Sequence, residues 1–466
     1  MRLRDLLIDI EPLRAGRDFR AAFIARTVSL FGLGIATVAL AAQVYRLTGT
    51  TVHVAAVSMV MSVSVLVGSL VGGVLADRSD RRRVIIIARS AAALGFAALA
   101  VNAMLPEPRL WAVYLCVAWD GLASGVSVTT LMAVVPTLVR RDQLPAAGAL
   151  MAITGELGSI FAPFLGGVLI AAWGAGFAFA ATAVTTALTS LLLTRLRPLP
   201  PARSTDGGDG GDGEGDGHDE SGSPMAALRF ALRERVVGGL LLLGGVTAFF
   251  GVPVVLFPEL VHTRFGGGDV MLGLLYTAPA VGSVLVSVGS GWIGRTAAPG
   301  KVLLAAVLVS GLAVAGFGLS PSVGPALAAL VVVGAAGTVY GILEYALVHH
   351  STPDRLRGRM AGVLTSQQTT GDIAGDAEVA LIARWFNPGA AAVFNGLLTA
   401  VTAVVVAVAV PGLRRATLPA EDDADADDTG ADGTGTGADG GPGTPSVPLG
   451  TGPAPVAAPP RAPAAG

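Results

Sequence analysis

Charged side chains are scarce in this sequence. Of its 466 residues only 14% are Asp, Glu, Lys or Arg, whereas 52% are hydrophobic. A soluble globular chain carries about 25% charged residues, so this chain has too little polar side chain to cover a soluble fold. Its apolar residues also lie in repeated runs of about 18 or more, the length that crosses a bilayer. The composition therefore excludes a soluble protein and predicts one that crosses the membrane several times.

Other absences narrow the class of protein further. Cys116 is the only cysteine and lies in an apolar run, which excludes an intrachain disulfide and suggests no redox chemistry. Residues 1–18 have neither a long apolar core nor a small-residue cleavage site, so we read them as a cytoplasmic segment instead of a signal peptide. Gly300 and Lys301 are followed by Val302 and lack the rest of a phosphate-binding loop. Without a cluster of metal ligands or nucleophiles either, we expect no enzyme activity, no metal and no nucleic-acid partner.

Twelve apolar segments predict an all-α membrane protein with twelve transmembrane helices. The segments are 19–45, 52–76, 84–105, 109–139, 145–171, 173–194, 236–262, 269–293, 301–319, 324–350, 358–384 and 388–410. The Asp- and Gly-rich centre of the gap at 195–235 cannot bury apolar surface, so this gap is a cytoplasmic linker. It divides the chain into six-helix halves at 19–194 and 236–410. Residues 411–466, acidic and then rich in Gly, Pro and Ala, are predicted to be a disordered cytoplasmic tail.

The placement of Arg and Lys predicts the orientation, because cytoplasmic loops collect positive charge. With the N-terminus inside, the inside segments hold 26 of the 31 Arg and Lys residues. The outside loops then hold only Arg46, Arg109, Arg264 and Arg384. Both termini are therefore expected in the cytoplasm, which agrees with an even number of spans. Two six-helix halves on a long linker suit a transporter that rocks around a central site.

A charged turn at residues 73–83, G-V-L-A-D-R-S-D-R-R-R, separates the second and third apolar segments. Its pattern resembles the signature loop of the major facilitator superfamily, which implies a conformational latch at the cytoplasmic helix ends. The matching residues are Gly73, Asp77, Arg78, Arg81 and Arg82. The family's usual second glycine is replaced here by Asp80. The alternative is a basic loop that only sets the topology.

The fifth apolar segment resembles a motif typical of drug-exporting members of that superfamily. Gly158, Pro163, Gly166 and Gly167 match it, with Ala162 at a position where glycine is usual. Proline removes a backbone donor and kinks a helix, and paired glycines permit close packing. The alternative is an ordinary kinked transmembrane helix.

Short runs across the membrane region are similar to the enterobactin exporter family. They include F-R-A-A-F-I-A-R (19–26), V-G-G-V-L-A-D-R (71–78), W-D-G (119–121), T-P-D-R-L-R-G-R-M-A-G (352–362) and T-G-D (370–372). The resemblance implies proton-coupled export of a siderophore or related secondary metabolite across the cell membrane. It implies no cofactor besides the proton gradient, and we expect a monomer in the lipid bilayer with a small-molecule substrate. A multidrug or antibiotic efflux antiporter is the alternative, and a non-transporting receptor or scaffold is a more distant one.

Charged and polar residues within the spans are candidates for the coupling or substrate pathway, because such residues are costly in a bilayer. They are Arg26, Asp120, Glu156, Glu344, Gln367, Asp372 and Asp376. Asp372 and Asp376 are four residues apart and share a helix face, which should line a water-filled path. In a proton-coupled exporter at least one carboxylate must bind and release a proton. The alternative for some of these residues is a fixed pairing, such as Arg26 with Asp120 or Glu156.

Overall fold

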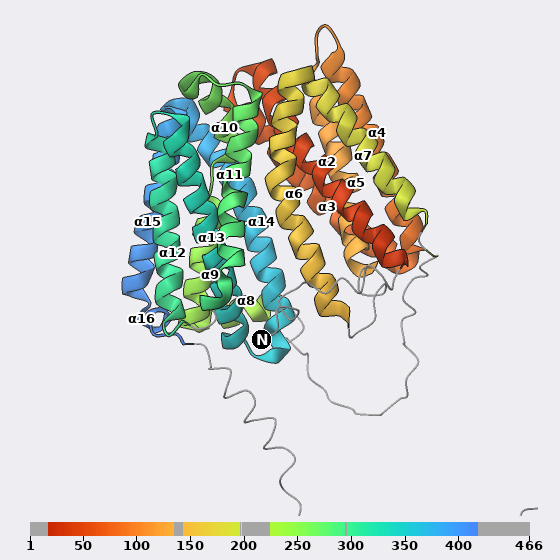
Figure 1. Ribbon diagram of the computed structural model, residues 1–466. Helices are drawn as coiled ribbons and strands as arrows, with labels where there is room; N and C mark the ends of the chain where they lie inside the picture. Colours follow the sequence, from red (N-terminus) through yellow and green to blue (C-terminus); the bar gives the residue numbers. More distant parts are fainter. Residues whose placement is uncertain (1–16, 135–142, 196, 198–223, 294–295, 418–466) are drawn as a thin grey trace, which may run out of the picture. The chain divides into compact units, whose positions relative to one another are not determined.

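In the computed structural model of the protein, the described residues are 17–134, 143–195, 197, 224–293 and 296–417 (Figure 1). Within these residues the chain forms helices and no strand. Residues 1–418 make one compact unit. Most of the predicted N-terminal segment, the centre of the linker and the tail from 418 onward lie outside the described residues.

The N-terminal half consists of six long helices joined by short connections. They are α2 (Arg17–Thr48), α3 (Thr51–Arg78), α4 (Arg81–Met104), α5 (Leu110–Val134), α6 (Leu144–Trp173) and α7 (Ala175–Leu193). Two of the connections are turns of two residues or fewer, because α3 follows α2 after Gly49 and Thr50 and α7 follows α6 after Gly174. Gly49 and Gly174 both have positive φ, a conformation that glycine adopts without a steric penalty.

The C-terminal half contains a less regular series of elements. They are α8 (Pro224–Arg233), α9 (Arg235–Phe249), η5 (Val254–Leu256), α10 (Phe257–Leu260), η6 (Val261–Phe265), α11 (Asp269–Val288), η7 (Ser290–Trp292), α12 (Pro299–Leu319), α13 (Val323–Ser351), α14 (Asp354–Trp385), α15 (Pro388–Ala409) and α16 (Pro411–Arg414). The predicted linker thus ends in a helix, α8. The predicted span at 236–262 is interrupted after Phe249, before Pro253 and the short helices that follow it.

Eleven helical segments of the described residues are long and apolar enough to cross a membrane. They match eleven of the predicted spans. The remaining predicted span lies in α14, which has 32 residues but a polar composition. This helix nevertheless packs against α3, α9 and α15, so it is part of the bundle.

The two halves meet along two helix pairs, α6 with α11 and α3 with α14 (Figure 1). The α6–α11 contact is made by backbone. A Cβ added to Gly167 would lie 2.5 Å from the Asp269 carbonyl oxygen, and one added to Gly273 would lie 2.7 Å from the Pro163 carbonyl oxygen. Only glycine fits these two positions without moving a helix.

The apolar core differs between the two ends of the bundle. We call them the Thr51 end, where α3 begins, and the Arg78 end, where α3 ends. At the Thr51 end one cluster of buried residues contains side chains from both halves, such as Val44, Phe179 and Phe257. At the Arg78 end the buried clusters of the described residues stay within one half each. The halves therefore share a core at only one end.

Candidate functional site

The charged turn at residues 73–83 connects α3 and α4 through Ser79 and Asp80 alone. Asp80 is the N-cap of α4, and its carboxylate accepts hydrogen bonds from the backbone N–H groups of Arg82, at 2.9 Å, and Arg83, at 3.4 Å. An aspartate cap typically stabilises a helix by about 1 kcal/mol. The replacement of the family's glycine by Asp80 thus has a structural reason.

The other residues of the predicted latch contact their own half. The Arg82 guanidinium donates to the Thr194 carbonyl just after α7, and the Arg81 Nε donates to the Ala76 carbonyl at 3.3 Å. Asp77 and Arg78 have exposed side chains, and Gly73 faces open space. The hydrogen bonds described here therefore fasten α3, α4 and the end of α7 together, and none of them crosses to the C-terminal half.

Polar contacts between the halves lie instead at the Thr51 end. The Arg46 guanidinium, at the end of α2, forms an ion pair with Asp269 at the start of α11. The Thr51 hydroxyl donates to the Glu259 carboxylate of α10. Our sequence analysis did not identify these four residues. Arg46 had the available signal, as one of four cations in predicted outside loops, but no pattern reveals its partner in the other half.

The motif in α6 lies where the two halves touch. Pro163 is inside the helix, and one turn earlier the Ile160 carbonyl accepts a hydrogen bond from Thr277 Oγ of α11 at 2.9 Å. Gly166 packs against the backbone of Ile35, and Gly158 packs against Leu30. Together with Gly167, the motif thus places α6 against both α2 and α11.

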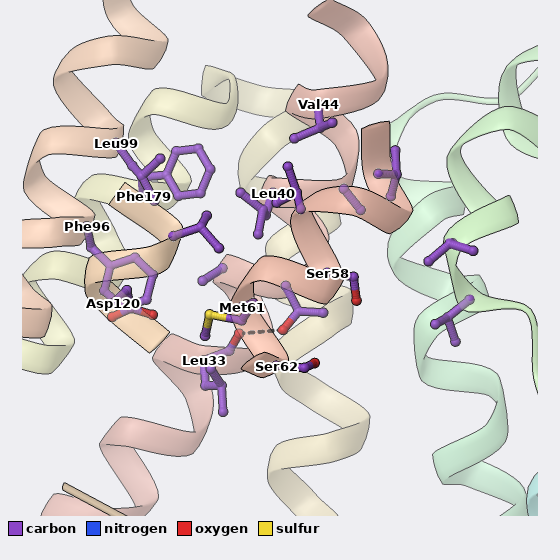
Figure 2. A pocket seen from close by; sticks show the side chains of 18 of the residues that line it. Leu33, Leu40, Val44, Ser58, Met61, Ser62, Phe96, Leu99, Asp120 and Phe179 are labelled. Carbon is purple, nitrogen blue, oxygen red and sulfur yellow. Dashed lines mark hydrogen bonds between the residues drawn. The ribbon is translucent and has the colours of Figure 1, made fainter. Parts of the chain in front are cut away.

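A small cavity of about 160 Å³, which we call the central cavity, lies between the halves. Figure 2 shows Asp120 beside Phe96 at one side of it and Ser58 and Ser62 at the other. Asp120 is only 2% exposed, and its Oδ1 atom has no hydrogen-bond partner in the described part of the chain. Such a buried polar atom is costly unless it finds a partner, so Asp120 is a candidate for binding a proton.

A larger cavity of about 620 Å³ adjoins the central cavity at Ser58 and Ser62. We call it the acid cavity, because Asp372 and Asp376 of α14 both line it. The Ser58 hydroxyl of α3 donates to Asp376 Oδ2 at 2.9 Å and so joins the two halves. The structure places the pair as the shared helix face predicts, facing a cavity.

Glu344 and Gln367 converge on α9 from two other helices. The Tyr340 hydroxyl donates to Glu344 Oε1 at 2.5 Å, and Gln367 Nε2 donates to the Leu241 carbonyl at 2.5 Å. A Cβ added to Gly244 would lie within about 3 Å of the Glu344 and Gln367 side chains. Sequence reasoning missed Tyr340, although it lies four residues before Glu344 and therefore on the same helix face.

Arg26 and Glu156 are placed apart from these acids. In the described residues no ion pair joins Arg26 to Asp120 or Glu156, so the fixed pairing considered for Arg26 is not found. The arginine that acts on Asp120 electrostatically is Arg89 of α4. Glu156 is half-buried on α6 and lines neither the central nor the acid cavity.

The chain matches the Major Facilitator Superfamily over residues 22–375. It belongs to this superfamily. It is 34% identical over 423 residues to a protein named "Enterobactin exporter EntS" from Citrobacter koseri, covering 90% of this chain and 98% of that protein. A protein of the same name from Salmonella typhi is 34% identical over 419 residues, covering 89% of this chain and 97% of that protein.

Solved transporter structures show the same fold at low sequence identity. A POT family transporter in complex with 5-aminolevulinic acid has a TM-score of 0.67 and 13% identity, covering 85% of this chain and 97% of that chain. The nucleoside transporter NupG has a TM-score of 0.67 and 13% identity, covering 86% and 100%. The resemblance seen in the sequence is thereby confirmed, and this superfamily member is a multi-pass transporter of the cell membrane and not an enzyme.

Proposed function

We propose that this transporter exports a siderophore or a related secondary metabolite in exchange for protons, by alternating access. Its curated relatives named as enterobactin exporters match nearly their whole length at 34% identity. The observation that carries the proposal is the pair of adjoining cavities between the halves, with Asp120, Asp372 and Asp376 in their walls. A small molecule bound there would contact both halves, as a rocking mechanism requires.

The proposed topology has twelve spans, both termini in the cytoplasm, and one chain as the working unit. The twelfth span is α14, whose acidic residues Asp372 and Asp376 line a cavity and therefore do not need to face lipid. With the N-terminus inside, an even number of spans also returns the C-terminus to the cytoplasm.

Proton coupling is proposed for Asp120 and Asp376. Asp120 is buried with an unpartnered oxygen, and Asp376 holds one half to the other through Ser58. Protonation of Asp376 would weaken a charge-assisted hydrogen bond, which is typically worth about 1.5–3 kcal/mol. Loss of that bond would release α3 from α14, which links a proton from the gradient to separation of the halves.

A deletion strain tests the export function directly. Its culture medium and cell extract are profiled by mass spectrometry under iron limitation. We expect a siderophore or related metabolite to accumulate in the cells and to disappear from the medium, and the gene in trans to reverse both changes. Unchanged profiles in medium and cells would contradict the proposal.

Everted vesicles test the coupling. Vesicles acidified inside should take up the exported metabolite, and a protonophore should abolish that uptake. Asp120→Asn and Asp376→Asn should each remove the gradient-driven uptake, while Glu107→Gln, which changes an exposed acid on a loop, should leave it intact. Uptake that is insensitive to the protonophore would exclude proton coupling.

General drug efflux is a second candidate, because the walls of the central cavity are mostly apolar. Side chains such as Leu40, Phe96, Leu99 and Phe179 could accept many hydrophobic molecules (Figure 2). Unaltered metabolite export together with increased sensitivity to hydrophobic antibiotics in the deletion strain would favour this function.

A further inference from the structure

A third cavity, of about 460 Å³, lies within the N-terminal half and is lined by Arg26 and Arg89. We call it the arginine cavity. It adjoins the central cavity, because Leu33, Met61 and Phe96 line both. Its volume is in the range of small-molecule sites, roughly 300–1,000 Å³. Neither arginine has a role in the fold or in the proposed coupling.

Both guanidinium groups lie far from the helix ends. Arg26 is nine residues after the start of α2 and Arg89 eight after the start of α4, which is roughly 12–14 Å along helices that rise about 1.5 Å per residue. Charged residues at such depth in a membrane protein are rare and normally mark a substrate or ion pathway.

The donors of the two arginines are incompletely satisfied. Arg89 Nη1 donates to the Ser29 hydroxyl at 2.5 Å, which fixes the orientation of the guanidinium. The Nε atoms of Arg26 and Arg89 are buried and have no hydrogen-bond partner in the described residues. The Nε edge of a guanidinium is one of its fork-shaped faces, which match the two oxygens of a carboxylate.

The charges around the cavity do not balance. Arg26 and Arg89 are the charged residues in its wall, and the acid that acts on Arg89 is Asp120, in the wall of the adjoining central cavity. Two cations thus face one carboxylate, and one positive charge has no counterpart. An anion in the arginine cavity would supply both the missing charge and the missing acceptors.

We propose that Arg26 and Arg89 form a binding site for the acidic group of the transported molecule, a carboxylate or a phenolate attached to an apolar body. The apolar part then extends past Leu33, Met61 and Phe96 into the central cavity. This inference rests on the proposed export function and adds the charge of the cargo: acids are accepted, and cationic drugs are rejected by the two guanidinium groups.

Equilibrium binding of radiolabelled salicylate tests the site, with salicylamide as a neutral compound of the same shape. The full-length protein is held in phosphatidylcholine nanodiscs, so that no anionic lipid competes. We expect salicylate to bind at least about tenfold more tightly than salicylamide, and Arg26→Gln and Arg89→Gln each to weaken salicylate more than about tenfold. Arg109→Gln, which removes an exposed arginine outside the cavity, is the matched control and should bind like the wild type.

Two further arms keep the result decisive. Arg26→Lys and Arg89→Lys retain the positive charge and should still prefer salicylate to salicylamide, which separates loss of charge from loss of folding. Nanodiscs of phosphatidylglycerol show whether a lipid headgroup occupies the site, and loss of salicylate binding there would overturn the assignment to cargo. So would equal binding of the two compounds, no binding of salicylate, or a preference that survives in both glutamine variants.

The binding result is independent of the test of the proposed function. If the arginine variants lose salicylate binding but the deletion strain still exports its metabolites, the site stands and the exported substrate is wrong. If the strain accumulates a metabolite but salicylate binding ignores the arginines, export stands and this inference fails.

Discussion

The two ends of the helix bundle are held together in different ways. At the Thr51 end the halves share one apolar core, the Arg46–Asp269 ion pair and the Thr51–Glu259 hydrogen bond. At the Arg78 end each half has its own buried cluster, and the hydrogen bonds of Asp80 and Arg82 stay within the N-terminal half. The comparison teaches that this structure represents one access state, closed at the Thr51 end, and that the signature loop belongs to the other state.

Locking the Thr51 end should have the largest effect on transport. We take a Cys116→Ser background, because Cys116 is the only cysteine, and introduce Arg46→Cys with Asp269→Cys. A bifunctional thiol reagent that spans the former ion pair should abolish transport, since alternation requires this end to open. Transport is measured in vesicles before and after the linker is cleaved by reductant. Each single-cysteine protein is the control, and transport that continues in the cross-linked protein would show that this end does not open.

Weakening the signature loop should have the next largest effect. Asp77→Asn should lower transport by about tenfold if Asp77 contributes about 1.4 kcal/mol to the state closed at the Arg78 end. The side chain is exposed in the present state, so the thermal stability of this state should not change. Transport and melting temperature are measured on the same preparation. A lower melting temperature with normal transport would make the loop a purely structural turn.

Breaking the ion pair at the Thr51 end should have a moderate effect in the opposite direction. The Asp269 side chain is only 11% exposed and that of Arg46 is 42% exposed, so the pair should contribute about 1 kcal/mol. Asp269→Asn should therefore shift the ratio of the two states about fivefold away from the one described here. Accessibility of a reporter Cys at position 51, in the Cys116→Ser background, measures the shift. Unchanged labelling would show that the apolar core alone closes this end.

The smallest effect concerns the cap of α4. Asp80→Ala removes the acceptor for the Arg82 and Arg83 backbone N–H groups and should lower the free energy of unfolding by about 1 kcal/mol. Asp80→Asn keeps a capping oxygen and serves as the control. Chemical denaturation in detergent measures the loss. Equal stability of both variants and the wild type would contradict the capping role.

Much of the fold could be predicted from the sequence because the bilayer imposes a simple rule on it. Apolar runs of membrane length gave eleven of the helical segments, and the turn between α3 and α4 lies at its predicted position. The break after Phe249 was missed. The apolar run continues through it, and hydropathy does not report that Pro253 and Gly251 interrupt the helix.

The candidate site was predictable in its members but not in their groupings. Depth in a span identified Asp120, Asp376, Glu344 and Arg26, since charge is costly there. It could not show that Asp376 bonds to Ser58, or that Arg26 lines a cavity with Arg89. Those partners come from helices distant in the sequence, and only packing brings them together. The Arg26 pairing considered from the sequence failed for this reason.

The backbone contact between Gly167 and Gly273 has a consequence for how force passes through the molecule. Because no side chain lies between α6 and α11 at this point, the contact has no rotamers to rearrange and can act as a fulcrum. The halves can tilt about it while the arms on either side, one toward Asp269 and one toward Thr277, move in opposite senses. The length of each arm is set by where these two glycines occur, so their position in the sequence fixes the amplitude of the stroke.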